Sequence, residues 1–374
     1  MPTVDLAIAG AGVFGLQLAR QALLQGLSVA IFDARRVGEG ASGGPLGALM
    51  PHIPDRWNAK KQFQFDALRE LEGECLALEE ATGLGTGYGR VGRMMPLREE
   101  RFIALAEERA HGAQAHWEGK FAFNRMEPDP NWIDPRLATH GAVLDTLAAR
   151  LHPSSYLSAL AKFVADHPNG RLYERTEVPL AATEGRRIET ADGPLSFAHL
   201  VLAAGYQSFP WLKGIIEVEP GTGVKGQARV VKAAAPAEAP ILYDDGCYVV
   251  PHANGTIAVG SSSQKQWTDE RAPDPEAWTF WDKALALCPA LREAPIIGEW
   301  AGVRPRAMSA DPMIGPVPDQ DGLWVFTGGF KISLGIAHLA GRALVHQITS
   351  LDEQTALPES FRAEVHLAAA RSAS

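Results

Sequence analysis

Cysteine is scarce in this chain. Only Cys75, Cys247 and Cys288 occur among 374 residues, they lie far apart, and none belongs to a C-x-x-C pair. This spacing predicts buried or incidental thiols, and the sequence offers no metal site. So few cysteines also suit a reducing compartment such as the cytoplasm.

Long apolar runs and an excess of positive charge are missing as well. No stretch of about 18 apolar residues occurs, so we expect no transmembrane segment. The first strand pattern begins at Val4, which leaves no room for a signal peptide and favours a cytoplasmic protein. The formal net charge of −9 argues against a general nucleic-acid or anionic-membrane binder, so no nucleic-acid partner is expected.

The first thirty-odd residues carry the clearest pattern in the chain. Val4–Ala9 is an apolar run typical of a buried parallel strand, and residues 10–15 follow at once as GAGVFG, a G-x-G-x-x-G motif. A helical pattern then runs to Gly26, and a second apolar strand, Leu27–Phe32, ends at Asp33. Strand, glycine turn, helix, strand and terminal acid together predict a dinucleotide-binding fingerprint.

Each part of this fingerprint has a physical role. Gly10 permits the tight turn out of the strand, Gly12 lets a pyrophosphate approach the backbone, and Gly15 lets the helix pack close to the sheet. The pyrophosphate then lies on unpaired N–H groups at the positive end of the helix. Asp33 is placed to accept hydrogen bonds from an adenosine ribose. The fingerprint predicts a dinucleotide but does not choose between NAD and FAD.

The remaining patterns predict an alternation of helices and strands. Five glycines among residues 35–50 predict a loop that approaches a ligand closely, and Ser42 is a candidate to bind a phosphate. Periodicity predicts helices over 59–82, 98–111, 153–167, 274–288 and 332–348, and strands near 141–144, 171–178, 187–190, 200–203 and 323–327. Residues 121–135 are predicted to be irregular. Residues 223–260 predict a separate antiparallel sheet with Asn254-Gly255 as a hairpin turn.

Several segments follow one another in an order that matches a known family. They are GAGVFG with Asp33, residues 41–51 (ASGGPLGALMP), 200–205 (LVLAAG), 224–227 (VKGQ), 248–262 (YVVPHANGTIAVGSS), 302–318 (GVRPRAMSADPMIGPVP) and 328–336 (GGFKISLGI). This series resembles the D-amino-acid oxidase superfamily of FAD oxidoreductases, and its motifs look most like those of glycine oxidase and monomeric sarcosine oxidase. Residues 41–51 look especially like the flavin domain of the bacterial tRNA wobble-uridine modification enzyme.

The resemblance implies FAD and a mixed α/β (α+β) fold. A Rossmann-type FAD-binding domain (1–85, 141–215 and 300–374) would be interrupted by an antiparallel-sheet substrate domain (86–140 and 216–299). The FAD should be noncovalent, because no cysteine stands near Gly302, where sarcosine oxidase-like members attach it. The expected cofactor-binding residues are Gly10, Gly12, Val13, Phe14, Gly15, Asp33, Ala34, Arg35, Ser42, Gly47, Ala48, Val178, Ala204, Gly205, Gly302, Gly329, Phe330, Lys331 and Ser333.

The expected chemistry selects a small set of catalytic candidates. Amine oxidation sends a hydride from Cα to the flavin, and a substrate carboxylate needs a fixed cation. The resemblance implies that Arg304, in the R-P position, holds this carboxylate, and that Lys331, in GFK, lies near the carboxylate or the flavin. His52 is a candidate to lie over the flavin ring, Tyr248 to cap the substrate pocket, and His252 to lie near the substrate cavity.

We therefore expect an FAD-dependent oxidase or dehydrogenase acting on an amino acid or secondary amine of the glycine, sarcosine or D-amino-acid type. The product would be an imine, and the electrons would pass to oxygen or a quinone. Two alternatives stay open. One is a larger secondary amine, such as a carboxymethylaminomethyl-modified tRNA base. The other is a catalytically silent flavin-binding partner protein, because Ala307-Met308-Ser309 replaces the T-P-D that is usual in the family.

Overall fold

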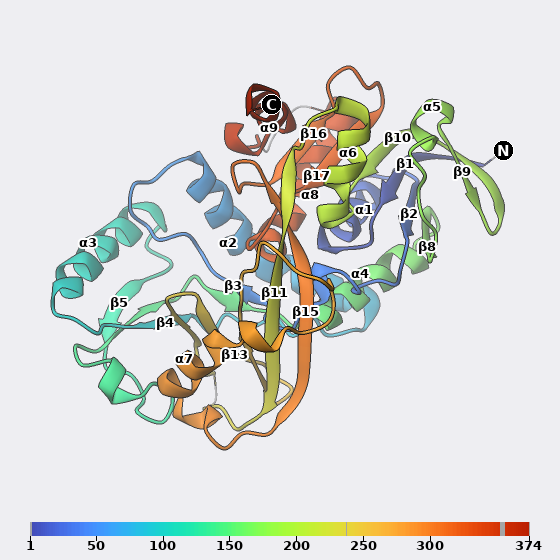
Figure 1. The fold of residues 1–374 in the computed structure, drawn as a ribbon. Coiled ribbons are helices and arrows are strands. Elements are labelled where there is room, and N and C mark those ends of the chain that lie inside the picture. Colours follow the sequence, from blue (N-terminus) through green and yellow to red (C-terminus); the bar gives the residue numbers. More distant parts are fainter. Residues whose placement is uncertain (1, 237, 352–355, 374) are drawn as a thin grey trace.

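Two β-sheets organise the chain in the computed structural model, which describes residues 2–236, 238–351 and 356–373 (Figure 1). Within these ranges the first sheet has seven strands, in the order β16-β17-β10-β1-β2-β8, with β9 paired to β10. Its central strands are parallel, while β9 and β16 run antiparallel to their neighbours. The bounds are β1 (Thr3–Ala9), β2 (Val29–Asp33), β8 (Gly170–Glu174), β9 (Arg187–Thr190), β10 (Gly193–Leu202), β16 (Met313–Pro316) and β17 (Leu323–Thr327).

Helices cover both faces of this sheet, as buried parallel strands require. The core on one face includes residues of α1 (Val13–Leu24), α2 (Ala59–Thr82), α4 (Pro153–Asp166) and α8 (Ser333–Thr349). The core on the other face includes residues of α5 (Ala182–Gly185), α6 (Ser208–Ile216) and α9 (Ala363–Ala373). Strand β1 contributes to both cores, because Leu6 and Ile8 belong to the first and Ala7 and Ala9 to the second.

The second sheet is largely antiparallel. In the described ranges it has eight strands, in the order β15-β11-β14-β13-β12-β4-β6-β5, and only the β12–β4 pair is parallel. Helix α7 (Thr279–Leu287) packs on its core, and α3 (Arg101–His116) lies at its outer side in Figure 1. The bounds are β4 (Arg93–Pro96), β5 (Phe123–Met126), β6 (Ala142–Asp145), β11 (Gly221–Lys232), β12 (Ile241–Asp244), β13 (Cys247–Pro251), β14 (Thr256–Gly260) and β15 (Ile296–Ala307).

Smaller elements connect the two sheets. Strand β3 (Ala48–Leu49) pairs with β7 (Ala149–Arg150), so the glycine-rich segment is tied to the entry of α4. The long strands β11 and β15 run side by side from the lower to the upper part of Figure 1. At the upper end Phe330 N donates to Pro305 O (3.2 Å), which joins β15 to the segment after β17. The 3-10 turns are η1 (Ala41–Gly43), η2 (Pro135–Leu137), η3 (Gly205–Gln207), η4 (Pro275–Ala277), η5 (Pro289–Leu291) and η6 (Glu359–Phe361).

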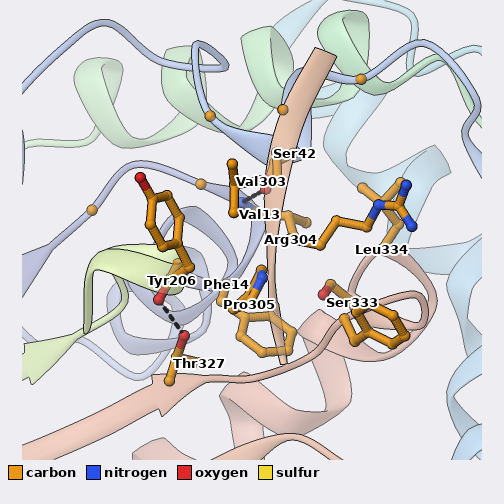
Figure 2. Close-up of a pocket in the computed structure, with 18 of the residues that line it drawn as sticks. Val13, Phe14, Ser42, Tyr206, Val303, Arg304, Pro305, Thr327, Ser333 and Leu334 are labelled. Atoms are coloured by element: carbon orange, nitrogen blue, oxygen red, sulfur yellow. Dashed lines mark hydrogen bonds between the residues drawn. The ribbon is translucent and has the colours of Figure 1, made fainter. Parts of the chain in front are cut away.

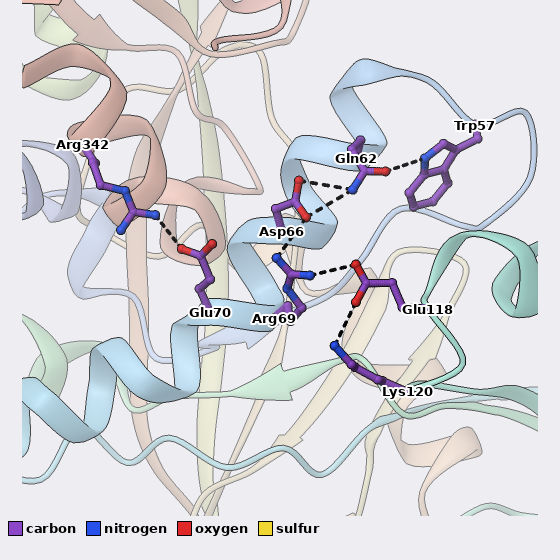
Figure 3. Close-up of polar contacts among 8 residues, drawn as sticks. All are labelled: Trp57, Gln62, Asp66, Arg69, Glu70, Glu118, Lys120 and Arg342. Carbon is purple, nitrogen blue, oxygen red and sulfur yellow. Dashed lines mark hydrogen bonds and ion pairs between the residues drawn. The ribbon is translucent and has the colours of Figure 1, made fainter. Parts of the chain in front are cut away.

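Helix α2 is fixed by polar contacts along its outer side (Figure 3). Arg342 of α8 donates to Glu70 (2.5 Å), and Arg69 donates to Glu118, which also accepts from Lys120 (2.8 and 2.9 Å). Exposed pairs of this kind contribute about 0–1 kcal/mol each. Their main effect is therefore to orient α2 between α8 and the segment that follows α3.

The predicted mixed α/β fold class is confirmed, and the helix predicted over 59–82 has those bounds. Several other elements differ from prediction. The helix predicted over 98–111 begins at Arg101 and continues to His116, the one predicted over 274–288 is an α-helix only over Thr279–Leu287, and the region 121–135 contains β5. The strand predicted over 171–178 ends at Glu174, because Arg175 adopts a positive φ of 53°. Elements β12, β16, α6 and α9 were not predicted.

The predicted domain boundaries do not coincide with the boundaries between the two sheets. Residues 142–145 were assigned to the FAD-binding domain, yet β6 pairs with β4 and β5 in the second sheet. Strand β15 crosses the predicted boundary at residue 300 because its whole length pairs with β11. The pairing partner, which lies far away in sequence, decides these memberships. The division into two domains itself stays a prediction.

The structure also bears on the cysteines and on the search for a membrane-spanning helix. All three cysteines, Cys75, Cys247 and Cys288, are free and buried, as predicted. Burial raises the pKa of each thiol to about 12, so none is a ready nucleophile. None of the helices in the described ranges combines the length and apolar character needed to cross a bilayer.

Replacing Gly15 by alanine should disrupt the first helix. An added Cβ would lie 1.9 Å from Gly10 O, which belongs to the glycine turn, so helix and turn would have to separate. Overpacking of this kind costs roughly 1–3 kcal/mol. Gly73→Ala, in α2, is the matched control, because its Cβ meets nothing within 4 Å. Thermal unfolding should show a loss only for Gly15→Ala, and equal unfolding temperatures would contradict the close packing.

Candidate active site

A cavity of about 950 Å³ lies at the carboxyl edge of the parallel sheet. Residues at or just after the ends of β1, β2, β10 and β17 line it, and residues 302–305 of β15 cross over it (Figure 2). Open α/β sheets bind ligands at this edge. The volume is near the upper end of the roughly 300–1,000 Å³ usual for ligand pockets, which suits an extended dinucleotide.

Hydrogen bonds shape the fingerprint end of the cavity. Ala11 N donates to Asp33 Oδ2 and Arg35 N donates to Asp33 Oδ1, both at 2.8 Å. Val13 N, at the start of α1, donates to Ser42 Oγ at 3.0 Å (Figure 2). The helix start and the carboxylate thus face one space, where an anion and a hydroxyl-bearing ribose are the matching groups.

Gly10 and Gly12 lie where a side chain would contact neighbouring atoms of the cavity wall. A Cβ on Gly10 would lie 2.4 Å from Ala203 O, and one on Gly12 would lie 3.1 Å from Ser42 Oγ. The β1 turn therefore touches the end of β10, and the wall beside Ser42 stays open for a pyrophosphate. This cradle fits the diphosphate of FAD.

The structure brings most of the predicted cofactor-binding residues together. Those that line the cavity are Gly10, Gly12, Val13, Phe14, Asp33, Ala34, Arg35, Ser42, Gly47, Ala48, Val178, Ala204, Gly205, Gly302, Phe330, Lys331 and Ser333. Gly15 and Gly329 do not line it. A Cβ on Gly15 would strike Gly10 O (1.9 Å), and one on Gly329 would strike the Phe14 ring (2.5 Å). These two glycines therefore serve packing around the site.

Arg304 of β15 also lines the cavity. Its guanidinium passes over Gly226 of β11, where a Cβ would lie 1.4 Å from Nη2, and that nitrogen donates to Ser262 O at 2.9 Å. Burial lowers the pKa of Arg304 to about 10, so the side chain stays charged at neutral pH. In the described residues it forms no ion pair. A half-buried cation without a carboxylate is suited to bind one from a ligand.

Lys331 lines the cavity as well. It follows Phe330, whose positive φ of 44° lets the chain turn from β17 into α8. The side chain is open to the cavity, yet neighbouring atoms displace water from the ammonium, and Arg304 repels it. Both effects lower the pKa of Lys331. Arg304 and Lys331 both lie close to the Phe330 ring, so the two cations face one region.

Two further side chains, one aromatic and one charged, line the cavity but were not predicted from the sequence. Tyr243 and Arg93 line the cavity beside the predicted Tyr248, and the two tyrosine rings lie 4.9 Å apart. Arg93 pairs with the fully buried Asp145 (2.6 Å between Nη2 and Oδ2). Burial raises the pKa of Tyr248 to about 12, so its hydroxyl keeps its proton and can donate. No local motif marks the Arg93–Asp145 pair, because its partners come from different strands.

The two predicted histidines have different positions. His52 lines the cavity, and its backbone N donates to Gln64 Oε1 at 2.7 Å. Its ring Nδ1 also meets Gln64 Oε1, and burial lowers the pKa, which favours a neutral ring that donates from Nδ1. His252 does not line the cavity. Its Nε2 donates to Pro45 O at 2.8 Å, so it supports the glycine-rich loop in place of the predicted catalytic position.

The site matches a known family. A family model described as FAD dependent oxidoreductase, DAO, matches residues 5–347. The chain belongs to this DAO family. FAD is therefore its cofactor, and the fit of the glycine cradle agrees with it. The FAD is held noncovalently, and none of the three cysteines lines the cavity.

Individual relatives of the DAO family show what the chain is similar to. Glycine oxidase of Pseudomonas aeruginosa is 29% identical over 360 residues, covering 91% of this chain and 93% of that protein. The tRNA 5-methylaminomethyl-2-thiouridine biosynthesis bifunctional protein MnmC of Paracidovorax citrulli is 28% identical, covering 98% of this chain but 60% of that protein. The crystal structure of glycine oxidase from Geobacillus kaustophilus shares the fold, with a TM-score of 0.83 at 21% identity over 97% of this chain and 98% of that one.

The loop 264–274 lies over part of the cavity and is held by hydrogen bonds from side chains of β11. Lys225 is 2% exposed, and its ammonium donates to Asp269 O (2.7 Å) and Ala272 O (2.6 Å). Gln227 is fully buried and donates to Asp274 O at 3.1 Å. Glu270 and Arg271 of this loop line the cavity. Lys225 is therefore committed to holding the loop and has no free access to a ligand.

Acid should destabilise the fold through His252. Burial lowers the pKa of this ring from 6.5 to about 4, so the unfolded chain binds the proton first. The free energy of unfolding should fall as the pH drops from about 6.5 to about 4, by roughly 3 kcal/mol at most for this group. His252→Gln keeps a donor for Pro45 O but does not titrate. Denaturant titrations at several pH values should therefore show that the free energy of unfolding depends less steeply on pH in this variant. His338, with a pKa of about 4, leaves a residual slope. An unchanged slope would contradict this account.

Removing the Lys225 ammonium should release the loop. Lys225→Met leaves two carbonyls without their donor, which costs roughly 1–3 kcal/mol. We expect faster proteolytic cleavage within 264–274 and weaker FAD retention on gel filtration. Lys265→Met, on the same loop, removes an exposed charge and is the control. Equal cleavage rates in the two variants would show that Lys225 does not hold the loop.

Proposed function

We propose that this chain oxidises the C–N bond of a small amino acid or secondary amine that carries a carboxylate. The observation that carries the proposal is Arg304, a cation that lines the cavity and forms no ion pair within the described residues. Membership of the DAO family, together with similarity to glycine oxidase over nine-tenths of the chain, supports the same reaction class.

The reaction divides the work between cofactor and protein. Bound FAD supplies a two-electron acceptor for the hydride that leaves the carbon beside nitrogen. Arg304 binds the carboxylate through two parallel N–H donors, which orients that carbon. Tyr248 offers its protonated hydroxyl as a further donor. The nitrogen reacts as a neutral amine and loses a proton, and water then hydrolyses the imine to an oxo acid and an amine.

The electron acceptor and the cellular site belong to the proposal as well. We infer that oxygen or a quinone takes the electrons and that the enzyme works in the cytoplasm. The scarce cysteines support a reducing compartment. Admitting air after anaerobic reduction distinguishes an oxidase from a dehydrogenase.

A second candidate is a larger secondary amine, such as a modified tRNA base. Similarity to the MnmC protein and the form of residues 41–51 favour it. The net charge of −9 speaks against it, because RNA binding favours a basic face. A silent flavin-binding protein is a third possibility, and turnover of any amine would eliminate it.

Anaerobic flavin reduction tests the proposal. Glycine, sarcosine, proline and D- and L-amino acids are added one at a time to the holoenzyme, and the flavin absorbance is followed. Bleaching by one of these compounds supports a small carboxylate substrate. If dithionite bleaches the flavin while every one of them fails, the proposal is wrong and the larger amine moves forward.

Arg304→Ala should abolish or severely weaken reduction by the substrate that bleaches the wild-type flavin. Loss of a buried charge pair costs roughly 2–5 kcal/mol. Arg304→Lys keeps the charge but loses the fork of donors, so it should recover part of the affinity. The FAD spectrum should stay unchanged in both variants. A wild-type apparent affinity and reduction rate in Arg304→Ala would rule out carboxylate binding by this residue.

A further inference from the structure

A second arginine, Arg93, faces the cavity from the second sheet. Strand β4 pairs with β12 and with β6, which places Arg93 opposite Ile241 and Asp145, and β12 pairs with β13, which places Tyr243 opposite Tyr248. Directly opposed residues share one face of a sheet, and so do residues two apart along one strand. Arg93, Tyr243 and Tyr248 therefore form one row on the same face, and all three line the cavity.

The guanidinium of Arg93 keeps one free edge. Its Nε donates to Asp145 Oδ2 at 2.7 Å, and its Nη2 lies 2.6 Å from the same oxygen. The polar contact of Nη1 within the described residues is the thioether of Met50, at 3.9 Å, and a thioether is a weak acceptor. The side chain is 4% exposed, and a buried donor without a strong acceptor is unfavourable. A ligand that brings an oxygen to Nη1 would remove this cost.

The buried carboxylate of Asp145 decides which oxygen fits. It also accepts from Ala148 N at 2.8 Å, so it is fixed against Arg93. The ion pair of Arg93 and Asp145 carries no net charge. A ligand carboxylate on Arg93 would leave one buried negative charge in excess, which is costly, whereas an uncharged carbonyl oxygen accepts a hydrogen bond without adding charge.

Tyr248 lies between Arg93 and Arg304 in this sheet. Burial raises the pKa of Tyr248 to about 12, and the nearby positive charges of Arg304 and Arg93 both oppose the rise. The Tyr243 ring lies 4.9 Å from the Tyr248 ring and 6.0 Å from the guanidinium carbon of Arg93. Four strands separate β15, which carries Arg304, from β4. Because neighbouring strands are about 4.8 Å apart, a molecule as small as glycine is too short to contact both arginines.

We propose that Arg93 is a specificity-determining residue, which binds an uncharged carbonyl or amide oxygen on the nitrogen substituent of the substrate, and that Asp145 is a positioning residue for its guanidinium. The substrate is then an N-substituted glycine with its carboxylate on Arg304. A substituent on nitrogen extends the molecule away from the carboxylate, whereas one on Cα branches beside it, so the former follows the row of side chains. This inference rests on the proposed function, since it names the substrate class of the same site.

The redox step is that of the proposed function. A C–H bond of the glycine carbon breaks, its hydride reduces FAD, the nitrogen loses a proton, and water cleaves the imine to glyoxylate and a primary amine. The primary amine keeps the carbonyl-bearing substituent. Arg93 contacts none of the bonds that change, so its effect should appear mainly in KM.

Three N-substituted glycines of equal length are the probes. N-(2-carbamoylethyl)glycine carries an amide, N-(3-methylbutyl)glycine is its apolar counterpart, and N-(2-carboxyethyl)glycine is its charged counterpart. Steady-state rates with the holoenzyme should give the amide probe a kcat/KM at least about tenfold above that of each counterpart, as expected for one hydrogen bond from a charged donor.

Two variants test the roles of the ion pair. Arg93→Met/Asp145→Asn removes the donor and both charges, so no buried charge is left unpaired, and the advantage of the amide probe over the apolar probe should fall to within about threefold. Asp145→Asn keeps the guanidinium without its counter-charge, so kcat/KM for the charged probe should rise about tenfold or more relative to the amide probe. Each ratio is taken within one variant, so a general loss of activity cancels.

Arg98→Gln/Asp244→Asn is the matched control. It removes an ion pair that joins the segment after β4 to β12, and neither residue lines the cavity. The ratios among the three probes should equal those of the wild-type enzyme, which separates the role of Arg93 from a general effect of losing an ion pair in this sheet.

The outcomes distinguish this inference from the proposed function. Reduction of the flavin by sarcosine or glycine, without an advantage for the amide probe, overturns the inference and leaves the proposed function intact. An amide advantage that survives in Arg93→Met/Asp145→Asn also overturns it, because another donor would then bind the amide. A wild-type preference for the charged probe does the same. No reduction by any of these compounds, with dithionite still effective, overturns both.

Discussion

The close contact between the first glycine turn and the end of β10 is the constraint on which the site depends. Gly10 lies against Ala203 so tightly that a single added carbon would stand 2.4 Å from Ala203 O. Because β1 and β10 are parallel neighbours, this contact aligns their carboxyl ends. The start of α1, the Asp33 carboxylate and Ser42 then converge on one edge, which creates the dinucleotide end of the cavity.

The long β11–β15 pair extends this edge into the second sheet. Gly226 and Gly302 are direct partners in that pair, and both lie where side chains would collide with Arg304 or Trp300. The missing side chain of Gly226 leaves the space that the guanidinium of Arg304 occupies, and that of Gly302 leaves space for the Trp300 ring. The backbone contact between Phe330 and Pro305 then closes the ring of elements around the cavity. Residues of both sheets thus line one continuous cavity.

The charged groups of the cavity differ in how they are compensated. Asp33 accepts two backbone hydrogen bonds, whereas Arg304 forms no ion pair within the described residues, inside a chain whose net charge is negative. The contrast between Arg93, neutralised by the buried Asp145, and Arg304, left without a carboxylate, shows that burial alone does not decide pairing. An unpaired cation of this kind is a candidate partner for an anionic ligand, and the proposed function rests on this difference in pairing rather than on any single pKa.

The sequence by itself determined the dinucleotide fingerprint and the strands and helix that form it, because these depend on local periodicity and on glycines at fixed spacing. The choice of FAD came from the order of motifs along the whole chain, since the fingerprint alone does not distinguish FAD from NAD. It also placed Arg304 and Lys331 at motif ends. Tertiary structure decided what no local pattern contains: β6 joining the second sheet, Arg93 pairing with Asp145, and His252 supporting Pro45 outside the cavity. Each of these depends on residues tens to hundreds of positions apart, so only the folded chain brings their charges and donors within reach.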